Sequence, residues 1–240
     1  MKTIVIGDIH GRTSWKDIIE KEQTWDKVIF IGDYFDSKNH TTDDQIENFH
    51  QIIKFKKDQN SDSEVVLLIG NHDIHYFPEI GDCSISGYQK ESAKKIESII
   101  IKNREHLQIA YQYGKYLFTH AGVSSVFLDN TIGLKNWDVP CIAKTLNTLF
   151  QYAPESFLFT GTEPTGNEVT QTPIWIRPEA LIKANFNTLK DKVIQIFGHT
   201  KIQSIKSFSD VTKNRYYLID TLGTSGEYLV IEDGKIKFRK

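Results

Sequence analysis

The amino-acid sequence predicts an α/β protein built on a parallel sheet, and two observations support this prediction. Short apolar runs alternate with amphipathic helical segments in the first half of the chain, which is the pattern of consecutive βαβ units. Each of the first three runs is also followed at once by a polar cluster that begins with glycine. Because ligands bind at the carboxyl ends of strands in open α/β sheets, we expect these clusters to converge there.

The first half of the chain supplies most of this alternating pattern. Its predicted strands are short runs of branched apolar residues, which favour extended structure. The helix after the second strand has Thr41 or Thr42 as a candidate N-cap and apolar residues on one face. We predict strands at 3–6, 27–31 and 64–69, and helices at 14–22, 42–57 and 88–104.

The second half returns to strands after a stretch that is harder to interpret. Residues 124–173 contain a predicted helix at 139–152 and then a loop rich in Gly, Thr and Pro. Asp233-Gly234 separates two strand patterns and predicts a hairpin. No repeat or linker divides the chain, so we expect residues 1–240 to form one domain. The strands predicted here are 108–111, 116–119, 193–197, 216–219, 227–231 and 235–239.

The composition excludes several classes of partner and location. The chain carries 29 Lys and Arg against 31 Asp and Glu, so it has no general electrostatic attraction to nucleic acid or acidic membranes. Its apolar runs are too short for a membrane span or a signal peptide. Cys83 and Cys141 are far apart and have no CxxC partner, so neither a disulfide framework nor a cysteine zinc site is expected. We therefore expect a soluble, cytoplasmic protein.

Five short polar motifs each follow a predicted strand directly. A lone histidine at a strand end is more often a hydrogen-bonded structural residue, and a lone Gly-Asp pair is usually a turn. The five motifs together contain four of the eight histidines, which turn chemistry alone does not explain. They are GDIHG with Asp8 and His10, GDYFD with Asp33 and Asp36, GNHD with Asn71 and His72, HAG with His120, and GHT with His199.

Carboxylates, imidazoles and one amide at such positions form a ligand set for divalent metals such as Mn, Fe or Zn. A carboxylate has two oxygens and can bridge two ions, so an aspartate is the natural shared ligand of a dinuclear site. The other histidines lie outside the pattern. His40, His50 and His106 resemble surface or helix residues, and His75 lies near the third motif without a pattern of its own.

The order of the five motifs resembles that of the calcineurin-like metallophosphoesterases. The resemblance is closer to their phosphoprotein phosphatase branch, which includes bacterial and phage serine/threonine phosphatases and the symmetrical dinucleoside tetraphosphatases. It spans the chain from Asp8 to about Thr221. It implies a four-layer α/β/β/α sandwich, in which two packed mixed β-sheets are flanked by helices and hold a dinuclear site at their edge. Residues 124–173 are then expected to be an insert that shapes the substrate groove.

The resemblance also implies a role for each motif residue. His72 matches the catalytic histidine and Asp36 the aspartate that pairs with it, while Arg177 in Ile-Trp-Ile-Arg-Pro resembles a phosphate clamp. Asp33 would bridge the two metals, and Asn71 would contact the substrate as well as a metal. The implied metal ligands are Asp8, His10, Asp33, Asn71, His120 and His199.

These roles imply hydrolysis of a phosphoester with two divalent metal ions as cofactors, manganese first, with iron or zinc as alternatives. Two such ions would bind phosphate oxygens and a bridging hydroxide, which attacks in line without a covalent phospho-enzyme. His72 would protonate the leaving alkoxide, and Arg177 would hold the phosphoryl oxygens bidentately.

The sequence departs from the branch pattern after the second motif. Branch members commonly have an Arg directly after GDxxD, whereas Asp36 is followed by Ser37 and Lys38. Lys38 or Arg12 could supply the missing charge as substrate-binding residues. The third motif ends in Asp73 where protein phosphatases usually have Glu. Both differences bear on the substrate more than on hydrolysis itself.

Three functions are therefore compared. A phosphatase acting on a phosphoprotein or a small phosphoester ranks first. A phosphohydrolase for dinucleoside polyphosphates or cyclic nucleotides is the alternative, because aromatic residues within 124–175 could stack a base. A metal-binding scaffold without turnover has the missing Arg as its only support. The expected partner is a phosphorylated substrate, and neither a membrane nor a nucleic acid is indicated.

Overall fold

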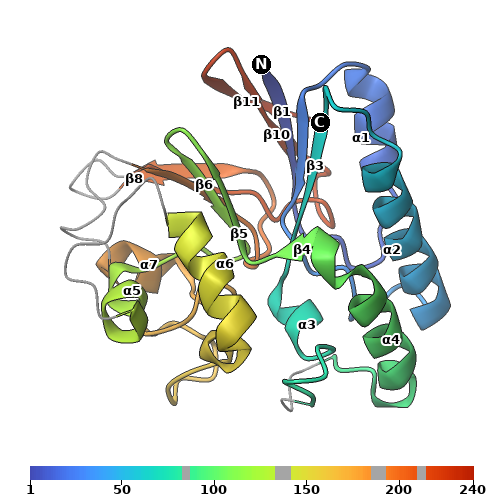
Figure 1. The fold of residues 1–240 in the computed structure, drawn as a ribbon. Coiled ribbons are helices and arrows are strands. Elements are labelled where there is room, and N and C mark those ends of the chain that lie inside the picture. Colours follow the sequence, from blue (N-terminus) through green and yellow to red (C-terminus); the bar gives the residue numbers. More distant parts are fainter. Residues whose placement is uncertain (83–86, 133–141, 185–192, 210–214) are drawn as a thin grey trace.

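The computed structural model describes residues 1–82, 87–132, 142–184, 193–209 and 215–240, which form two packed β-sheets with helices outside them (Figure 1). Among these residues, six strands form sheet A in the order β11-β10-β1-β2-β3-β4, and five form sheet B in the order β5-β6-β7-β9-β8. Both sheets are mixed, since β1 is parallel to β2 but antiparallel to β10, and β6 is parallel to β7 but antiparallel to β5. The predicted α/β fold with two mixed sheets flanked by helices is confirmed.

The elements follow one another in nearly the order that the sequence predicts. Sheet A contains β1 (Lys2–Ile6), β2 (Lys27–Phe30), β3 (Glu64–Leu68), β4 (Leu107–Gln108), β10 (Tyr228–Glu232) and β11 (Lys235–Arg239). Sheet B contains β5 (Ala110–Tyr113), β6 (Tyr116–Thr119), β7 (Ile194–Phe197), β8 (Lys206–Ser209) and β9 (Arg215–Leu218). The α-helices are α1 (Trp15–Glu22), α2 (Thr42–Lys57), α3 (Asn71–Ile74), α4 (Ala93–Asn103), α5 (Ser125–Ile132), α6 (Ile142–Tyr152) and α7 (Pro178–Ala184). Single 3₁₀ turns are η1 (Lys90–Ser92), η2 (Arg104–His106) and η4 (Pro154–Phe157).

Apolar side chains fill both faces of sheet A. On β1, Val5 belongs to the core between the two sheets, whereas Ile4 and Ile6 belong to the core under the helices. Strands β2 and β3 alternate in the same way, which explains why their sequences are continuous apolar runs. Helices α1, α2 and α4 cover the outer face of sheet A, while α6 packs on β5 and β6 of sheet B (Figure 1).

The predicted strand at 108–111 is divided between the two sheets. Strand β4 ends at Gln108 and continues sheet A, where Leu107 pairs with Leu67 of β3. Strand β5 begins at Ala110 and opens sheet B, where Ala110 pairs with Thr119 of β6. The chain therefore changes sheets at this point. Pairing with distant strands decides the break, and the local apolar pattern contains no sign of it.

Short turn and cap signals agree with the structure where they involve only neighbouring residues. Thr41, the first of the two candidate caps, is the N-cap of α2, and its Oγ1 accepts a hydrogen bond of 3.2 Å from the backbone N–H of Asp44. Asp233 and Gly234 both have positive φ, 50° and 75°, between β10 and β11. Positive φ at both positions is what a tight two-residue hairpin requires, so the hairpin prediction is confirmed.

The described part of the chain contains one strand and three α-helices that the sequence does not predict, because their sequences have no extended apolar pattern. These are β8, of which most residues are exposed, the single turn α3 within GNHD, and the short helices α5 and α7. Other predictions fall outside the described residues. One is the expectation that Cys83 and Cys141 form no disulfide, from which a reducing compartment is inferred. The other is the start of the predicted 139–152 helix, because residues 139–141 are not described. No helix within the described ranges is both long and apolar enough to cross a membrane.

Glu22 joins the end of α1 to one edge of sheet A. Its side chain is 1% exposed, and its carboxylate lies 2.7 Å from Lys2 Nζ on β1, 2.6 Å from the Tyr228 hydroxyl on β10 and 2.5 Å from Arg239 Nη1 on β11. Burial alone raises the pKa of Glu22, but the hydrogen bonds from Lys2, Tyr228 and Arg239 outweigh it and lower the pKa to about 2. The charged form of Glu22 is therefore the form that stabilises the fold.

We predict that Glu22→Gln lowers the free energy of unfolding at neutral pH by about 2 kcal/mol, because it removes the buried charge that pairs with Lys2 and Arg239, whose side chains are 16% and 34% exposed. A lowered pKa gives stability that is present above the ordinary value of 4.5 and is lost as pH falls through about 2. The wild type should therefore lose stability over this range, and the variant should lose less. Urea unfolding across these pH values measures both effects, with Glu20→Gln on the exposed face of α1 as the matched control. An unchanged pH dependence in the Glu22 variant would contradict the prediction.

Candidate metal centre

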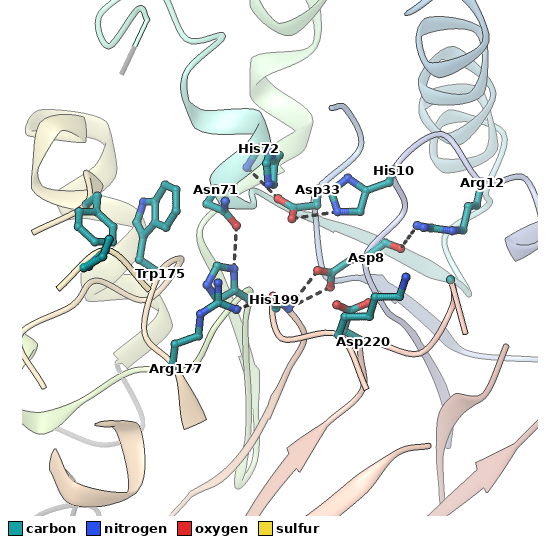
Figure 2. A pocket seen from close by; sticks show the side chains of 14 residues that line it. Asp8, His10, Arg12, Asp33, Asn71, His72, Trp175, Arg177, His199 and Asp220 are labelled. Atoms are coloured by element: carbon teal, nitrogen blue, oxygen red, sulfur yellow. Dashed lines mark hydrogen bonds and ion pairs between the residues drawn. The ribbon is translucent and has the colours of Figure 1, made fainter. Parts of the chain in front are cut away.

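The loops that follow β1, β2, β3 and β7 surround a pocket of about 560 Å³ at one edge of the two sheets (Figure 2). Motif residues that lie far apart in the sequence converge there, as expected for the carboxyl ends of parallel strands. The lining residues are Asp8, His10, Arg12, Asp33, Asn71, His72, Phe159, Pro164, Trp175, Arg177, His199, Lys201, Asp220 and Gly223.

The backbone turns sharply at this edge, and four predicted site residues adopt the left-handed conformation. A positive φ is uncommon for residues other than glycine and costs on the order of 1–3 kcal/mol, so it persists only where the surroundings fix it. Each of the four lies in a loop after a strand end, where the chain turns; three of them line the pocket, and Asp36 lies behind His72. They are His10 (φ 42°), Asp33 (φ 54°), Asp36 (φ 60°) and His199 (φ 65°).

Two glycines let neighbouring loops approach the carboxylates of Asp33 and Asp8 closely. A Cβ atom on Gly70 would lie 2.1 Å from Oδ1 of Asp33, and one on Gly198 would lie 2.0 Å from Oδ1 of Asp8. Both distances are far below van der Waals contact, so no side chain fits at either position. Glycine at the start of GNHD and GHT is therefore a requirement of the site's geometry as well as of the turn.

Asp73 holds the loops after β2 and β3 together. Its carboxylate accepts backbone hydrogen bonds from Asp33 (2.8 Å), Tyr34 (2.8 Å) and Gly70 (2.9 Å). The backbone N–H of His72 in turn donates to Oδ1 of Asp33 at 2.9 Å. The position that differs from protein phosphatases thus carries a structural carboxylate, which orients Asp33 through its own main chain.

Two histidines direct an unprotonated nitrogen at Asp33. Nδ1 of His10 lies 2.7 Å from the carbonyl oxygen of Phe35, and Nδ1 of His120 lies 3.0 Å from that of Ile31. Because a carbonyl can only accept, Nδ1 carries the proton in both rings and Nε2 keeps its lone pair. Each Nε2 nevertheless lies 3.4 Å from Oδ2 of Asp33, which also offers only lone pairs. A cation between these atoms would satisfy the lone pairs of all three.

The amide of Asn71 and the imidazole of His199 extend the same cluster. The Asn71 Oδ1 atom lies 2.9 Å from Nε2 of His120 and 2.8 Å from Nδ1 of His199. The backbone N–H of His199 donates to both oxygens of Asp8, at 3.1 and 3.0 Å. Nε2 of His199 is buried and has no hydrogen-bond partner within the described parts of the chain. Every side chain of the cluster thus presents a donor atom suited to a metal.

The protonation states agree with a metal site. Burial lowers the pKa of His10, His120 and His199, so the neutral form that coordinates metals prevails near neutral pH. Burial and the charges of Asp220 and Asp33 raise the pKa of Asp8. Ligand atoms of Asp8, Asp33 and His120 all lie within 4.8 Å of one another, a spacing that could hold an ion.

His72 stands beside this cluster and is paired with Asp36. Its Nδ1 lies 3.0 Å from Oδ2 of Asp36, and its ring lies 5.3 Å from that of His10. Burial alone lowers the pKa of His72, but Asp33 and Asp36 outweigh it and raise the pKa above its ordinary value. Asp36 is itself held by the hydroxyl of Tyr76 and, at 3.1 Å, by Nε2 of Gln89.

His75 belongs to the same network, although its sequence position gives no pattern. It is fully buried, and its Nε2 lies 2.7 Å from Oδ2 of Asp36. Oδ2 of Asp36 therefore faces two imidazoles, those of His72 and His75. Burial alone raises the pKa of Asp36, but these imidazoles and the Tyr76 hydroxyl hold it below its ordinary value. A charged Asp36 keeps the proton of His72 on Nδ1 and leaves Nε2 facing away from the pair.

Arg177 and Arg12 stand on opposite sides of the pocket (Figure 2). Arg177 is held by three hydrogen bonds, from Nε to the carbonyl of Thr165 (2.8 Å) and from Nη1 to the carbonyl of His199 and Oγ1 of Thr200 (both 3.1 Å). Arg12 donates from Nη1 to the carbonyl of Ile9 at 3.2 Å. Both guanidinium groups are thus anchored to backbone close to the carboxylates.

The structure brings most of the predicted site residues into the pocket and places three elsewhere. His120 is fully buried against Asn71, Asp36 lies behind His72, and Lys38 lines an adjoining cavity. Sequence reasoning missed Asp220 and Lys201. Asp220 follows the end of β9, the same signal as the other motifs but without a glycine before it, and burial and Asp33 raise its pKa to about 6.

A buried group of carboxylates and imidazoles at the edge of two packed sheets is a ligand set suited to divalent metals. The chain belongs to the calcineurin-like phosphoesterase family, whose profile matches residues 1–210. The family uses divalent metals and hydrolyses phosphoric esters, so the chain is a hydrolase of this class.

Solved structures share this fold at low sequence identity. A cold-active protein-tyrosine phosphatase from a psychrophilic Shewanella species is 17% identical with a TM-score of 0.63, over 99% of this chain and 77% of that one. A protein serine/threonine phosphatase from Saccharomyces cerevisiae, with similarity to human phosphatase PP5, is 14% identical with a TM-score of 0.55, over 100% and 79%. No curated protein matches the chain at the level of sequence.

We predict that Asp73→Asn lowers the free energy of unfolding by about 2–4 kcal/mol, because the new amide group would oppose a backbone N–H that the carboxylate now accepts. Equilibrium urea unfolding measures this loss. The control is Asp62→Asn in the exposed turn before β3, which should change stability by less than about 0.5 kcal/mol. Equal stability of the two variants would show that Asp73 does not hold the loops.

Proposed function

We propose that the chain is a two-metal phosphoester hydrolase of the phosphoprotein phosphatase branch, acting on a phosphoprotein or a small phosphoester. The position of Asp33 carries this proposal. One of its oxygens lies 3.4 Å from the lone-pair nitrogens of both His10 and His120, so the carboxylate is placed to be shared between two cations. Manganese is the proposed metal, with iron or zinc as alternatives, because this ligand set suits all three.

The donor atoms divide into two sets around Asp33. Asp8 and His10 would hold one ion, and Asn71, His120 and His199 the other. Two bound ions neutralise phosphate oxygens and lower the pKa of water, which supplies a nucleophile near neutral pH. The crowding that raises the pKa of Asp8 supports this assignment, because a divalent charge is what stabilises adjacent buried carboxylates.

His72 is the group placed to complete the reaction. When water's oxygen joins phosphorus and the bond to the leaving oxygen breaks, the leaving alkoxide needs a proton. His72 holds one, since Asp33 and Asp36 oppose burial and raise its pKa, and its ring lines the pocket. Asp36 is a positioning residue, because it fixes the ring through Nδ1 at 3.0 Å and leaves Nε2 for the leaving group.

Arg177 is the proposed phosphate clamp. Its guanidinium is oriented by Thr165 and Thr200 and lines the pocket beside His199. A planar fork fixed in this way binds two phosphoryl oxygens at once, which a flexible lysine cannot do. Asn71 is proposed to contact the same phosphate, because it lines the pocket between the imidazoles.

An aromatic wall favours nucleotides as the second candidate substrate class. Phe159 and Trp175 line the pocket next to Arg177 and pack edge to face with ring centroids 5.3 Å apart. Phe159 and Pro164 come from the proposed 124–173 insert, so the insert would shape the groove on this side. A base of a dinucleoside polyphosphate or cyclic nucleotide could pack here. A phosphoprotein ranks first because the chain matches a protein-tyrosine phosphatase and a protein serine/threonine phosphatase in fold.

The central test is manganese-dependent hydrolysis of p-nitrophenyl phosphate. We expect His72→Ala to lower kcat by about 10²–10⁴-fold, because it removes the general acid and keeps the metal ligands. Its manganese stoichiometry, measured by metal analysis after gel filtration, should stay at the wild-type value. His50→Ala, on the exposed face of α2, is the control and should leave both quantities unchanged.

Measuring turnover and manganese binding together, in the wild type and in Asp33→Asn, distinguishes an enzyme from a metal-binding scaffold. We expect this variant to lose both turnover and manganese binding, because an amide offers one oxygen where two ions need two. Calorimetric titration with manganese measures binding independently of activity. Wild-type protein that binds two ions and hydrolyses no phosphoester in a broad panel would support the scaffold instead. Turnover that is undiminished in both His72→Ala and Asp33→Asn would exclude the mechanism.

A further inference from the structure

A second cavity adjoins the metal pocket on the side of His72. It has a volume of about 340 Å³ and shares His10, Arg12, His72 and Lys201 with the larger pocket. If His72 donates its proton to the leaving oxygen, the leaving group lies next to His72, and this cavity is the space beside it. The remaining lining residues are Asp36, Ser37, Lys38, Asn39 and Gly87.

The described lining of this cavity is strongly cationic. It contains Arg12, Lys38 and Lys201 and, among the described residues, a single carboxylate, Asp36. The side chain of Asp36 has no exposed surface and is engaged by His72 and other internal partners. Lys38 and Lys201 are exposed, and neither forms an ion pair within 4.0 Å in the described parts of the chain, although the charge of Lys201 acts at longer range on Asp220 of the main pocket. Their charges are therefore available to a ligand.

The two sides of the site differ in kind. On the far side, Arg177 is fixed beside Trp175, where it can hold the phosphate that is transferred (Figure 2). On the His72 side, two flexible lysines and Arg12 border a space that the transferred phosphate does not need to fill. Lysine is a mobile point charge, which suits an anion whose position varies from one substrate to another.

We propose that this cavity is a subsite for an anionic group on the leaving group, either a carboxylate or a second phosphate. The inference rests on the proposed function and narrows its substrate class to phosphoesters that carry a further negative charge near the leaving oxygen. Lys38 and Lys201 are the residues that select for this charge, with Arg12 fixed between the two cavities.

Two substrates that differ only in charge test the proposal. 4-Carboxyphenyl phosphate carries an anion on its leaving group, and 4-carbamoylphenyl phosphate is its neutral counterpart of the same shape. We divide kcat/KM for the carboxylate substrate by kcat/KM for the carbamoyl substrate. We expect this ratio to be about three- to tenfold lower in the double variant Lys38→Gln/Lys201→Gln than in the wild type. Differences in intrinsic reactivity cancel, because each variant is compared with the wild type on both substrates.

Two control variants separate charge from structure. Lys38→Arg/Lys201→Arg keeps the charges and should keep most of the wild-type ratio. Lys94→Gln removes a charge from α4, where the side chain is 92% exposed, and should leave the ratio unchanged. A wild type that hydrolyses neither substrate would overturn the proposed function itself. A ratio that stays constant in the double glutamine variant, with both substrates hydrolysed, would overturn the subsite alone.

The same variants distinguish the two chemical sources of the anion. A phosphoserine peptide with glutamate neighbours is compared with one that has glutamine neighbours, and ADP is compared with AMP. If the double glutamine variant affects the glutamate peptide selectively, the subsite binds carboxylates. If it affects ADP selectively, the subsite binds a second phosphate. Equal effects within both pairs would overturn the proposal.

Discussion

The crowding of buried carboxylates at the edge of two sheets is the constraint on which the rest of the structure depends. Asp8 and Asp33 are 1% and 2% exposed, and Asp220 lies beside them. Like charges at this depth repel one another strongly, since little water screens them. The neutral imidazoles around them add lone pairs and no positive charge. Divalent cations would stabilise this arrangement, and the loops after the strands hold the carboxylates close to one another.

Several features of the backbone hold the carboxylates in this arrangement, and some of them are energetically unfavourable. Left-handed conformations at His10, Asp33 and His199 turn the chain at strand ends, and each is energetically unfavourable by itself. The buried carboxylate of Asp73 fixes two of the loops through three backbone hydrogen bonds. The stable part of the molecule is the continuous apolar packing on both faces of sheet A, which lies directly beneath these loops. Strain at the edge is thus tolerated because the strands that end there are firmly packed.

The sequence predicts those parts of the site that depend on local pattern. Asp8, Asp33, Asn71 and His199 could be found because each follows an apolar run and a glycine, and parallel strands bring such positions to one edge. Asp220 has no glycine before it, so nothing local separates it from a surface aspartate. The break at residue 109 and the partners of Asp36 depend on which distant strands and loops pair, which a local pattern does not contain.

The arginine that is absent after the second motif is best considered together with the two cavities of the site. Lys38 lines the cavity on the His72 side, whereas Arg177, the proposed phosphate clamp, lines the main pocket. An arginine fixed in that cavity would favour anions that can bind it in one bidentate geometry. Two exposed lysines would instead bind anions of various shapes, because each is a mobile point charge. If the proposed subsite is correct, the departure from the branch pattern concerns how the leaving group is bound. In the proposed mechanism hydrolysis depends on the buried cluster around Asp33, which does not include positions 37 and 38.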